Sequence, residues 1–333
     1  MIVRFGYVAM STTVQHASPS RTMTFKTFQS IDDRVAALRR LESIARENLH
    51  NTLRLLRHNA AHGIQVYRFS SKLIPLATHG ELGDWNPYPV LQDAFEELGD
   101  FVKKHEMRVS FHPDHFTVLS TPRPEVLRNS ISDLKHHVAM LQAMGLSGQA
   151  KNNIHVGGAY GDKPSAASRF IENVTALPDE IKERLTFEND DKTFNAIETL
   201  DICKKLRIPM VLDIHHQWVN NEGEAPADLW EDIAKTWTSP YAQAGSSPDH
   251  PLPPKIHTSS PKSVSDPRGH ADHVIVTPLL DFLRKIAPST KQVDVMLEAK
   301  LKDGALFTLM ADLAKFHHEG VEIIDEATIR IKG

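Results

Sequence analysis

The stretch IPMVLDIHHQW, residues 208–218, places reactive side chains at the end of an apolar run. Its strand-like part, PMVLDIHH (209–216), ends in Asp213, His215 and His216. Carboxylates and imidazoles are costly to bury without partners, so their position at a strand end indicates a function rather than packing. The same arrangement recurs along the chain, and this recurrence indicates the fold as well as the site.

Eight short runs in the chain have the apolar and β-branched composition of strands. Besides 209–216, they are IVRFGYVA (2–9), IQVYRFS (64–70), MRVSFHP (107–113), NNIHVGG (152–158), RLTFEND (184–190), KIHTS (255–259) and VDVMLEA (293–299). Segments with helical periodicity lie between them, for example at 34–63, 124–145, 192–208 and 277–287, and the first two end in glycine. Strands alternating with helices indicate parallel βαβ units, and eight of them predict one α/β domain over residues 1–333, a closed (β/α)₈ TIM barrel. The segments 11–31 and 239–254 are expected to be loops on one rim.

Composition fits a globular protein in a reducing compartment. The chain is 41% hydrophobic and 24% charged, and it contains one cysteine, Cys203, within a helical pattern. A single cysteine excludes an intramolecular disulfide, and no apolar run approaches the roughly 20 residues that cross a membrane. The first residues, MIVRFGYVAMS, lack the pattern of a signal peptide. We therefore expect a cytoplasmic protein, and a monomer, without a membrane partner.

The net charge of −4 argues against a nonspecific nucleic-acid binder, which usually has a basic excess. It does not exclude DNA, because carboxylates that bind metal ions add to the formal charge without presenting a negative surface. The more unusual number is 19 histidines, several of them at the ends of apolar runs. In a TIM barrel the carboxyl ends of all strands meet on one face, where active sites lie. The residues expected there include Tyr7, Arg68, His112, His155, Glu188, Asp213, His216, Lys255, His257 and Glu298.

Imidazole and carboxylate groups without thiolates form a donor set that suits zinc, manganese or iron. The candidate ligands are His112, His155, Glu188, Asp213, His216, His257, His270 and Glu298. One ion takes three or four protein ligands, so eight candidates predict two or three ions, with carboxylates such as Glu188 shared between them. Sites of this type activate water and stabilise both the attacking and the leaving oxygen of a phosphoester displacement.

Two positions leave alternatives open. In a strand, His215 and His216 would point to opposite faces, and we assign His216, three residues after Asp213, to the metal. Lys255 and His257 are two residues apart and share a strand face. Because metal ions repel an ammonium group, Lys255 either contacts a substrate phosphate or carries a carboxyl group and becomes a ligand.

Several motifs together resemble those of the UV damage endonucleases. They are RFGY, FHPDHF, IHVGGAYGDK, FENDDKTFN, VLDIHH, PKIHTSS, GHADH and VMLEAK, and they occur in order from residue 2 to about residue 302. The resemblance implies a single-domain barrel related in fold to endonuclease IV. It also implies that the protein repairs DNA without ATP and binds up to three divalent ions, commonly Mn²⁺. Such enzymes nick the strand immediately 5′ of cyclobutane dimers, 6–4 photoproducts and some other distortions in double-stranded DNA.

The resemblance also implies how the ligands divide among the ions. The first ion would be held by His112, His155 and Glu188, the second by Glu188, Asp213, His257 and Glu298, and the third by His216, His270 and a carboxylated Lys255. On this reading Glu188, Lys255 and His257 form the catalytic centre. Mn²⁺ is the expected ion, with Zn²⁺ or another divalent ion as the alternative.

DNA contacts are implied for two further groups of residues. Tyr7, His115 and Phe116 would probe the lesion by stacking in the space that the damaged pair vacates. The family pattern has Gln and Tyr where this chain has His115 and Phe116, so the ring is kept but the phenolic hydroxyl is lost; the alternative for Phe116 is a loop-anchoring core residue. Phosphate contacts are expected from Arg68, Lys163 and Lys300, each of which is otherwise a surface charge.

Other activities share parts of this pattern. A sugar isomerase or epimerase of the xylose-isomerase-like kind would use the same barrel with fewer metals, and the surplus ligands at His112, His216 and His270 count against it. A lesion-binding protein without catalysis would not need a full ligand set. An abasic-site endonuclease would use the same metals, so only its preferred DNA substrate distinguishes it.

Overall fold

The computed structural model describes residues 1–332 and contains a closed ring of eight parallel strands. Each strand pairs with the next, and the eighth pairs with the first. The ring consists of β1 (Ile2–Val8), β2 (Val66–Arg68), β3 (Arg108–Phe111), β4 (Lys151–His155), β5 (Leu185–Glu188), β6 (Met210–Asp213), β7 (Lys255–Thr258) and β10 (Gln292–Leu297). This closure confirms the predicted TIM barrel.

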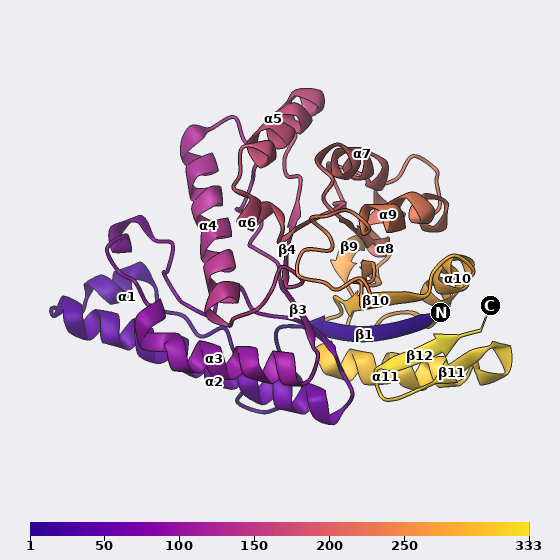
Figure 1. The fold of residues 1–333 in the computed structure, drawn as a ribbon, viewed down its shortest axis with the longest axis horizontal. Coiled ribbons are helices and arrows are strands. Elements are labelled where there is room, and N and C mark those ends of the chain that lie inside the picture. The colour runs from indigo at the N-terminus through magenta and orange to yellow at the C-terminus, as the bar shows by residue number, and fades with distance from the viewer. Residues whose placement is uncertain (333) are drawn as a thin grey trace.

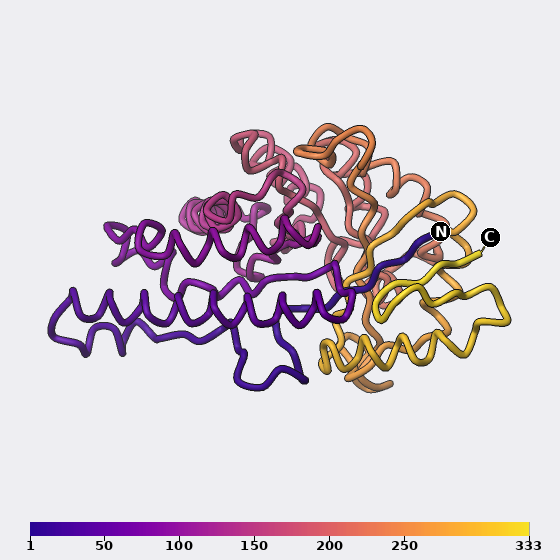
Figure 2. The backbone as a smooth tube through the Cα atoms, turned by 60° about the horizontal axis from the view of Figure 1, so that its bottom comes forward, coloured from indigo at the N-terminus to yellow at the C-terminus, as the bar shows by residue number. Residues whose placement is uncertain are grey.

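Helices surround the barrel, and the longest, α2, packs side by side with α3 (Figures 1 and 2). The helices are α1 (Phe25–Gln29), α2 (Arg34–Ala61), α3 (Tyr88–Lys104), α4 (Pro124–Ala143), α5 (Lys163–Thr175), α6 (Asp179–Lys182), α7 (Ala196–Leu206), α8 (Ile214–Val219), α9 (Trp230–Thr236), α10 (Val276–Ile286) and α11 (Lys302–Ala314), with 3₁₀ turns at η1 (Gly80–Leu82), η2 (Pro226–Leu229) and η3 (His317–Glu319). None of the described helices is both long and apolar enough to cross a membrane. Gly63 and Gly145 have positive φ just past α2 and α4, as their predicted role at helix ends requires.

Four strands lie outside the predicted eight. The hairpin β8 (Pro261–Ser263) and β9 (Asp266–His270) follows β7, and β11 (Val321–Ile323) and β12 (Thr328–Ile331) end the described chain. Strand β12 pairs antiparallel with the first half of β1, while the second half of β1 pairs with the short β2. The two ends of the described chain consequently lie together (Figure 1), and the Met1 amino group donates to the Ile331 carbonyl at 2.7 Å.

Two sequence-based predictions about local structure are wrong. Strand β6 ends at Asp213, whose side chain caps α8 by accepting from the His216 amide at 2.8 Å. His215 and His216 therefore lie on a helix, about 100° apart around its axis, rather than on opposite faces of a strand. The loops 11–31 and 239–254 also lie at opposite ends of the barrel, because one follows β1 and the other precedes β7.

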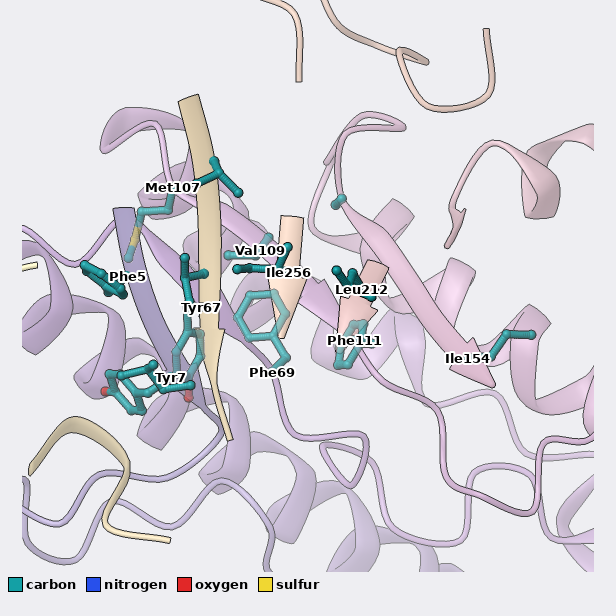
Figure 3. Packing of buried hydrophobic residues seen from close by; sticks show 14 of the residues in the cluster. Phe5, Tyr7, Tyr67, Phe69, Met107, Val109, Phe111, Ile154, Leu212 and Ile256 are labelled. Carbon is teal, nitrogen blue, oxygen red and sulfur yellow. The ribbon is translucent and has the colours of Figure 1, made fainter. Parts of the chain in front are cut away.

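Aromatic side chains fill the barrel wall near the carboxyl end of β1 (Figure 3). Tyr7 and Tyr67 pack edge to face with ring centroids 5.4 Å apart, and Tyr67 packs in the same way on Phe69. The Tyr7 side chain is fully buried, and its hydroxyl donates to Asn59 on α2 at 2.6 Å. These contacts fix the relation between the barrel and its longest helix.

Charged residues close the opposite, amino end of the barrel. Asp294 Oδ2 lies 2.7 Å from both Arg4 Nη2 and Arg108 Nη1, and Asp294 is completely buried. Burial would raise the pKa of the Asp294 carboxyl, but the guanidinium groups of Arg108 and Arg4 outweigh burial and lower it. Arg108 also donates to the carbonyl of Pro253, which ties the loop before β7 to this end.

Candidate metal centre

The carboxyl ends of the strands bring two groups of ligand-type side chains together. One group contains His112, His155 and Glu188, and the other contains Glu188, Asp213, His257 and Glu298. Within each group the ligand atoms all lie within 4.8 Å of one another. These are the sets that the sequence motifs implied for the first and second ions, and Glu188 belongs to both.

The two oxygens of Glu188 face different groups. Its Oε2 lies 3.2 Å from His112 Nε2 and 3.9 Å from His155 Nε2. Its Oε1 lies 3.1 Å from His257 Nδ1 and 3.7 Å from His216 Nδ1. A carboxylate oriented in this way can bridge two cations, because each oxygen is available to a separate ion.

Three of the histidines are oriented by backbone carbonyls. The Nδ1 atom of His112 lies 3.0 Å from the Pro113 carbonyl, that of His216 lies 2.9 Å from the Asn189 carbonyl, and that of His270 lies 2.8 Å from the Glu298 carbonyl. A carbonyl only accepts, so each Nδ1 carries the proton and leaves Nε2 with a free lone pair. This arrangement is typical of metal-binding histidines.

Buried atoms without partners also fit a cation. Among the described residues, Asp213 Oδ2 and His155 Nδ1 are buried and have no hydrogen-bond partner. Burial would raise the pKa of Glu188, yet the imidazoles of His257 and His155 bring it well below its ordinary value. Conversely, burial would lower the pKa of His257, but the Glu188 and Glu298 carboxylates outweigh it and raise that pKa. Three carboxylates, those of Glu188, Asp213 and Glu298, offer ligand atoms within 4.8 Å of one another, and divalent ions would neutralise their charge.

The third implied group is only partly assembled. The rings of His216 and His270 have centroids 6.3 Å apart, and both adjoin the second group through Asp213 and Glu298. Lys255 belongs to neither of the two groups; it is buried, and its Nζ donates to Ser110 Oγ at 2.9 Å. Burial, and then the nearby Arg108 and Arg68, lower the pKa of Lys255 to about 7.

A cleft of about 1040 Å³ opens over these groups. Its lining includes His112, His155, His216, His270 and Glu298 on the floor and Lys72, Lys192 and Arg268 among the polar walls. The loop 112–118, between β3 and α4, borders this cleft and carries the predicted lesion probes.

The structure separates the three predicted probes. His115 and Phe116 project from the loop with their rings 4.0 Å apart, and Phe116 is 74% exposed. This exposure contradicts the alternative that Phe116 anchors the loop in the core. Tyr7 is fully buried against Tyr67 and Asn59, so the prediction that Tyr7 stacks on DNA is wrong for this structure.

The three predicted phosphate contacts differ in their surroundings. Arg68 forms an ion pair with Glu298 at the edge of the second group and lines the cleft. Lys163, at the first position of α5, pairs with Glu198 Oε2 at 2.7 Å. Lys300 is exposed just after β10. None of these positions contradicts a phosphate contact, and all three roles stay predictions.

Sequence reasoning missed residues that hold the ligands. Asn153 donates through Nδ2 to Glu188 Oε2, and its own Oδ1 accepts from Thr186 at 2.7 Å. Asn189 pairs with the backbone of Asp213 through two hydrogen bonds of 2.9 Å. The signal for Asn153 was present, since asparagine is disfavoured in strands and yet NNIH lies in one.

Replacing Asn153 with the similarly shaped Leu should weaken metal binding. Without the amide donor, the bridging Glu188 carboxylate is free to rotate away from one of the two groups. Loss of such a supporting hydrogen bond typically costs about 10–100-fold in metal affinity. Calorimetric titration with Mn²⁺ measures this change. Asn59→Leu, which removes a buried amide that contacts Tyr7 instead, should leave the affinity unchanged.

A closed (β/α)₈ barrel with histidine and carboxylate groups at its carboxyl rim defines a class of metal-dependent enzymes. Comparison with known proteins narrows this class. The profile of the UV-endonuclease UvdE family matches residues 3–330. The UV DNA damage endonuclease of Bacillus pumilus is 44% identical over 318 residues, which are 94% of this chain and 95% of that protein. That of Halalkalibacterium halodurans is 41% identical over 317 residues, 95% of each chain.

Solved structures agree with this assignment. The crystal structure of SacUVDE superimposes with a TM-score of 0.79 at 30% identity, covering 95% of this chain and 99% of that one. Endonuclease IV of Thermus thermophilus, at 12% identity and a TM-score of 0.53, shares the fold. The chain belongs to the UV-endonuclease UvdE family. This membership confirms the family, the fold and the nuclease class that the sequence predicted.

Proposed function

We propose that this chain cleaves one strand of damaged double-stranded DNA immediately 5′ of UV photolesions, using two or three divalent ions, with Mn²⁺ the preferred one. The observation that carries the proposal is the shared Glu188, whose two oxygens face two separate ligand groups beneath an open cleft. Relatives that cover nearly the whole chain, and that are named UV DNA damage endonucleases, support the choice of substrate.

The ligand groups would bind the ions, and the remaining residues would orient the DNA. Bound divalent ions would lower the pKa of water and neutralise charge on the scissile phosphate. Asp213, Glu298 and His257 would hold one ion beside Glu188, since Glu188, Asp213 and His257 belong to barrel strands and Glu298 directly follows β10. Arg68, next to Glu298 at the cleft wall, is placed to contact a neighbouring phosphate.

Lys255 presents a chemical choice at this centre. Burial, which lowers the pKa of Lys255 to about 7, favours the neutral amine. A neutral amine adds to carbon dioxide, forming an N–C bond and releasing one proton to give a carbamate, so the predicted carboxylated Lys255 is compatible with its burial beside Ser110. In that form the side chain would carry a negative charge and could serve as a ligand.

Lesion recognition would depend on the exposed pair His115 and Phe116. A dimer is already poorly stacked, so its extrusion from the helix costs less than that of intact bases. The two rings, in contact with each other, would enter the vacated space as an apolar wedge. The enzyme would then recognise deformability rather than base edges, which would allow one site to accept several lesions.

Phe116→Ala should weaken binding to dimer-containing DNA by about 5–150-fold, because stacking of an aromatic ring on a base contributes roughly 1–3 kcal/mol. Binding to undamaged duplex should hardly change. Fluorescence anisotropy with a labelled duplex measures both. Ile324→Ala, at an exposed apolar position beyond β11 at the far end of the barrel, is the matched control. Equal losses on damaged and intact DNA would contradict the wedge role.

The deciding assay uses duplexes with one defined cyclobutane dimer, one abasic site, or no lesion. We expect a single nick 5′ of the dimer after addition of Mn²⁺ to metal-free protein, without ATP. Zn²⁺ in a parallel arm tests the choice of ion. Cleavage of the abasic duplex alone would assign the chain to the abasic-site endonucleases instead. Conversion of a ketose without nicking would favour an epimerase.

A further inference from the structure

His215, next to the metal-site residue His216, is fully buried and makes two short hydrogen bonds. Its Nδ1 lies 2.6 Å from Ser259 Oγ, just after β7, and its Nε2 lies 2.7 Å from the carbonyl of Pro267 in β9. His215 itself belongs to α8. One imidazole thus joins a helix, a barrel strand end and the hairpin β8–β9.

The hydrogen-bond partners of His215 determine which of its ring nitrogens carries the proton. The Pro267 carbonyl only accepts, so Nε2 of His215 donates. With Nε2 protonated, Nδ1 of the neutral ring accepts from the Ser259 hydroxyl. Both ring nitrogens are occupied by these hydrogen bonds, so His215 has no atom left for a metal. It differs in this respect from His216, whose Nε2 is free.

The hairpin that His215 holds is otherwise mostly exposed. All three residues of β8 are exposed, and in β9 none is buried. The last residue of β9 is His270, whose ring meets the His215 ring edge to face with centroids 5.6 Å apart. The hydrogen bond to Pro267 is therefore a link from the barrel interior into the strand that carries His270.

We propose that His215 is a positioning residue, which holds β9 so that His270 faces His216 and completes the site of the third ion. The inference rests on the proposed function, which includes that ion. His215 joins the two elements that supply the two histidines, α8 and β9. Of the two adjacent histidines, His216 would bind the metal and His215 would position β9.

The first test uses metal-free protein, because the hydrogen bonds from His215 to Ser259 and Pro267 do not require an ion. His215→Phe keeps a ring of similar shape but removes both hydrogen bonds. Amide hydrogen exchange should become at least about tenfold faster across residues 261–270 and remain unchanged in strands β1 to β6. His136→Phe is the matched control, since His136 is a half-buried histidine on α4 that bonds Tyr88.

Mn²⁺ titration, followed by metal analysis and electron paramagnetic resonance, gives the second readout. His215→Phe should weaken one of three bound ions about 10–100-fold and leave the other two unchanged. His215→Gln, which keeps a donor for the Pro267 carbonyl, should restore part of that affinity. A merely structural role would lower stability without this selective loss.

The outcomes separate the inference from the function on which it rests. Wild-type protein with three ions, together with a selective loss in His215→Phe, supports the proposal. Three ions in both proteins, equal weakening of all ions, or unchanged exchange in the hairpin would overturn it while the endonuclease assignment stands. Wild-type protein that binds only two ions would remove the third site from the proposed function and the positioning role with it.

Discussion

Glu188→Gln is expected to lower the nicking rate on dimer-containing DNA by about 10³-fold. The amide keeps the shape of the side chain but offers one neutral oxygen in place of two charged ones, so it cannot bridge the two ligand groups. Losing several kcal/mol of charge stabilisation in the transition state corresponds to this change in rate. Single-turnover cleavage with saturating Mn²⁺ measures it.

The same variant should still bind the lesion, because His115 and Phe116 lie outside the ligand groups. Glu322→Gln is the control, since Glu322 is an exposed carboxylate that pairs with Arg330 on the antiparallel strands β11 and β12. Nicking by Glu188→Gln at the wild-type rate would show that the carboxylate does not bridge the reacting centre.

Asp294→Asn is expected to destabilise the protein by about 3–5 kcal/mol at neutral pH. The substitution removes the charge that compensates Arg4 and Arg108, and Arg108 is almost fully buried. Breaking a buried ion pair by removing one partner leaves an uncompensated charge, which costs this amount. Urea unfolding followed by circular dichroism measures the free energy of unfolding.

The effect should depend on pH in a defined direction. The folded-state pKa of Asp294 is lowered, so its stabilising contribution is present above the unfolded pKa of about 3.9 and is lost as the pH falls through the folded value. Wild type and variant should therefore converge in strongly acidic solution. Asp312→Asn, which removes a surface pair with Lys315, should change stability by less than about 1 kcal/mol. A similarly small effect of Asp294→Asn would contradict the stabilising role of the ion pairs that Asp294 forms with Arg4 and Arg108.

The barrel and its candidate ligands could be predicted from the sequence because both follow from strand ends, whereas the division of the ligands into groups was implied by the resemblance to the UV damage endonucleases. Parallel strands with buried faces form apolar runs, and polar residues at their ends must meet on one face. This reasoning found Glu188, Asp213, His257 and Glu298 although they are distant in the chain. It does not depend on the exact boundary of any strand.

The errors arose where a local pattern permits two structures. The run ending in DIHH continues a strand pattern, but the Asp213 side chain caps a helix, so α8 begins there. Tyr7 lies near the end of a strand, as the ligands do. Its ring is nevertheless buried in the aromatic core, and its hydroxyl donates to Asn59 on α2. The direction of a side chain at the barrel rim depends on packing with distant helices, which periodicity does not encode.

The supporting residues were missed for a different reason. Asn153 and His215 act through hydrogen bonds to partners 35 and 52 residues away, and no spacing rule connects them. Buried polar residues in strand or helix patterns are the available signal. Their partners became evident only when the fold placed them together.

Anomalous diffraction from crystals grown with Mn²⁺ tests the central claim most directly. We expect one Mn²⁺ peak among His112, His155 and Glu188 and a second among Glu188, Asp213, His257 and Glu298, with Glu188 bonded to both. Peaks elsewhere on the protein, or a single ion without Glu188 as a shared ligand, would contradict the account.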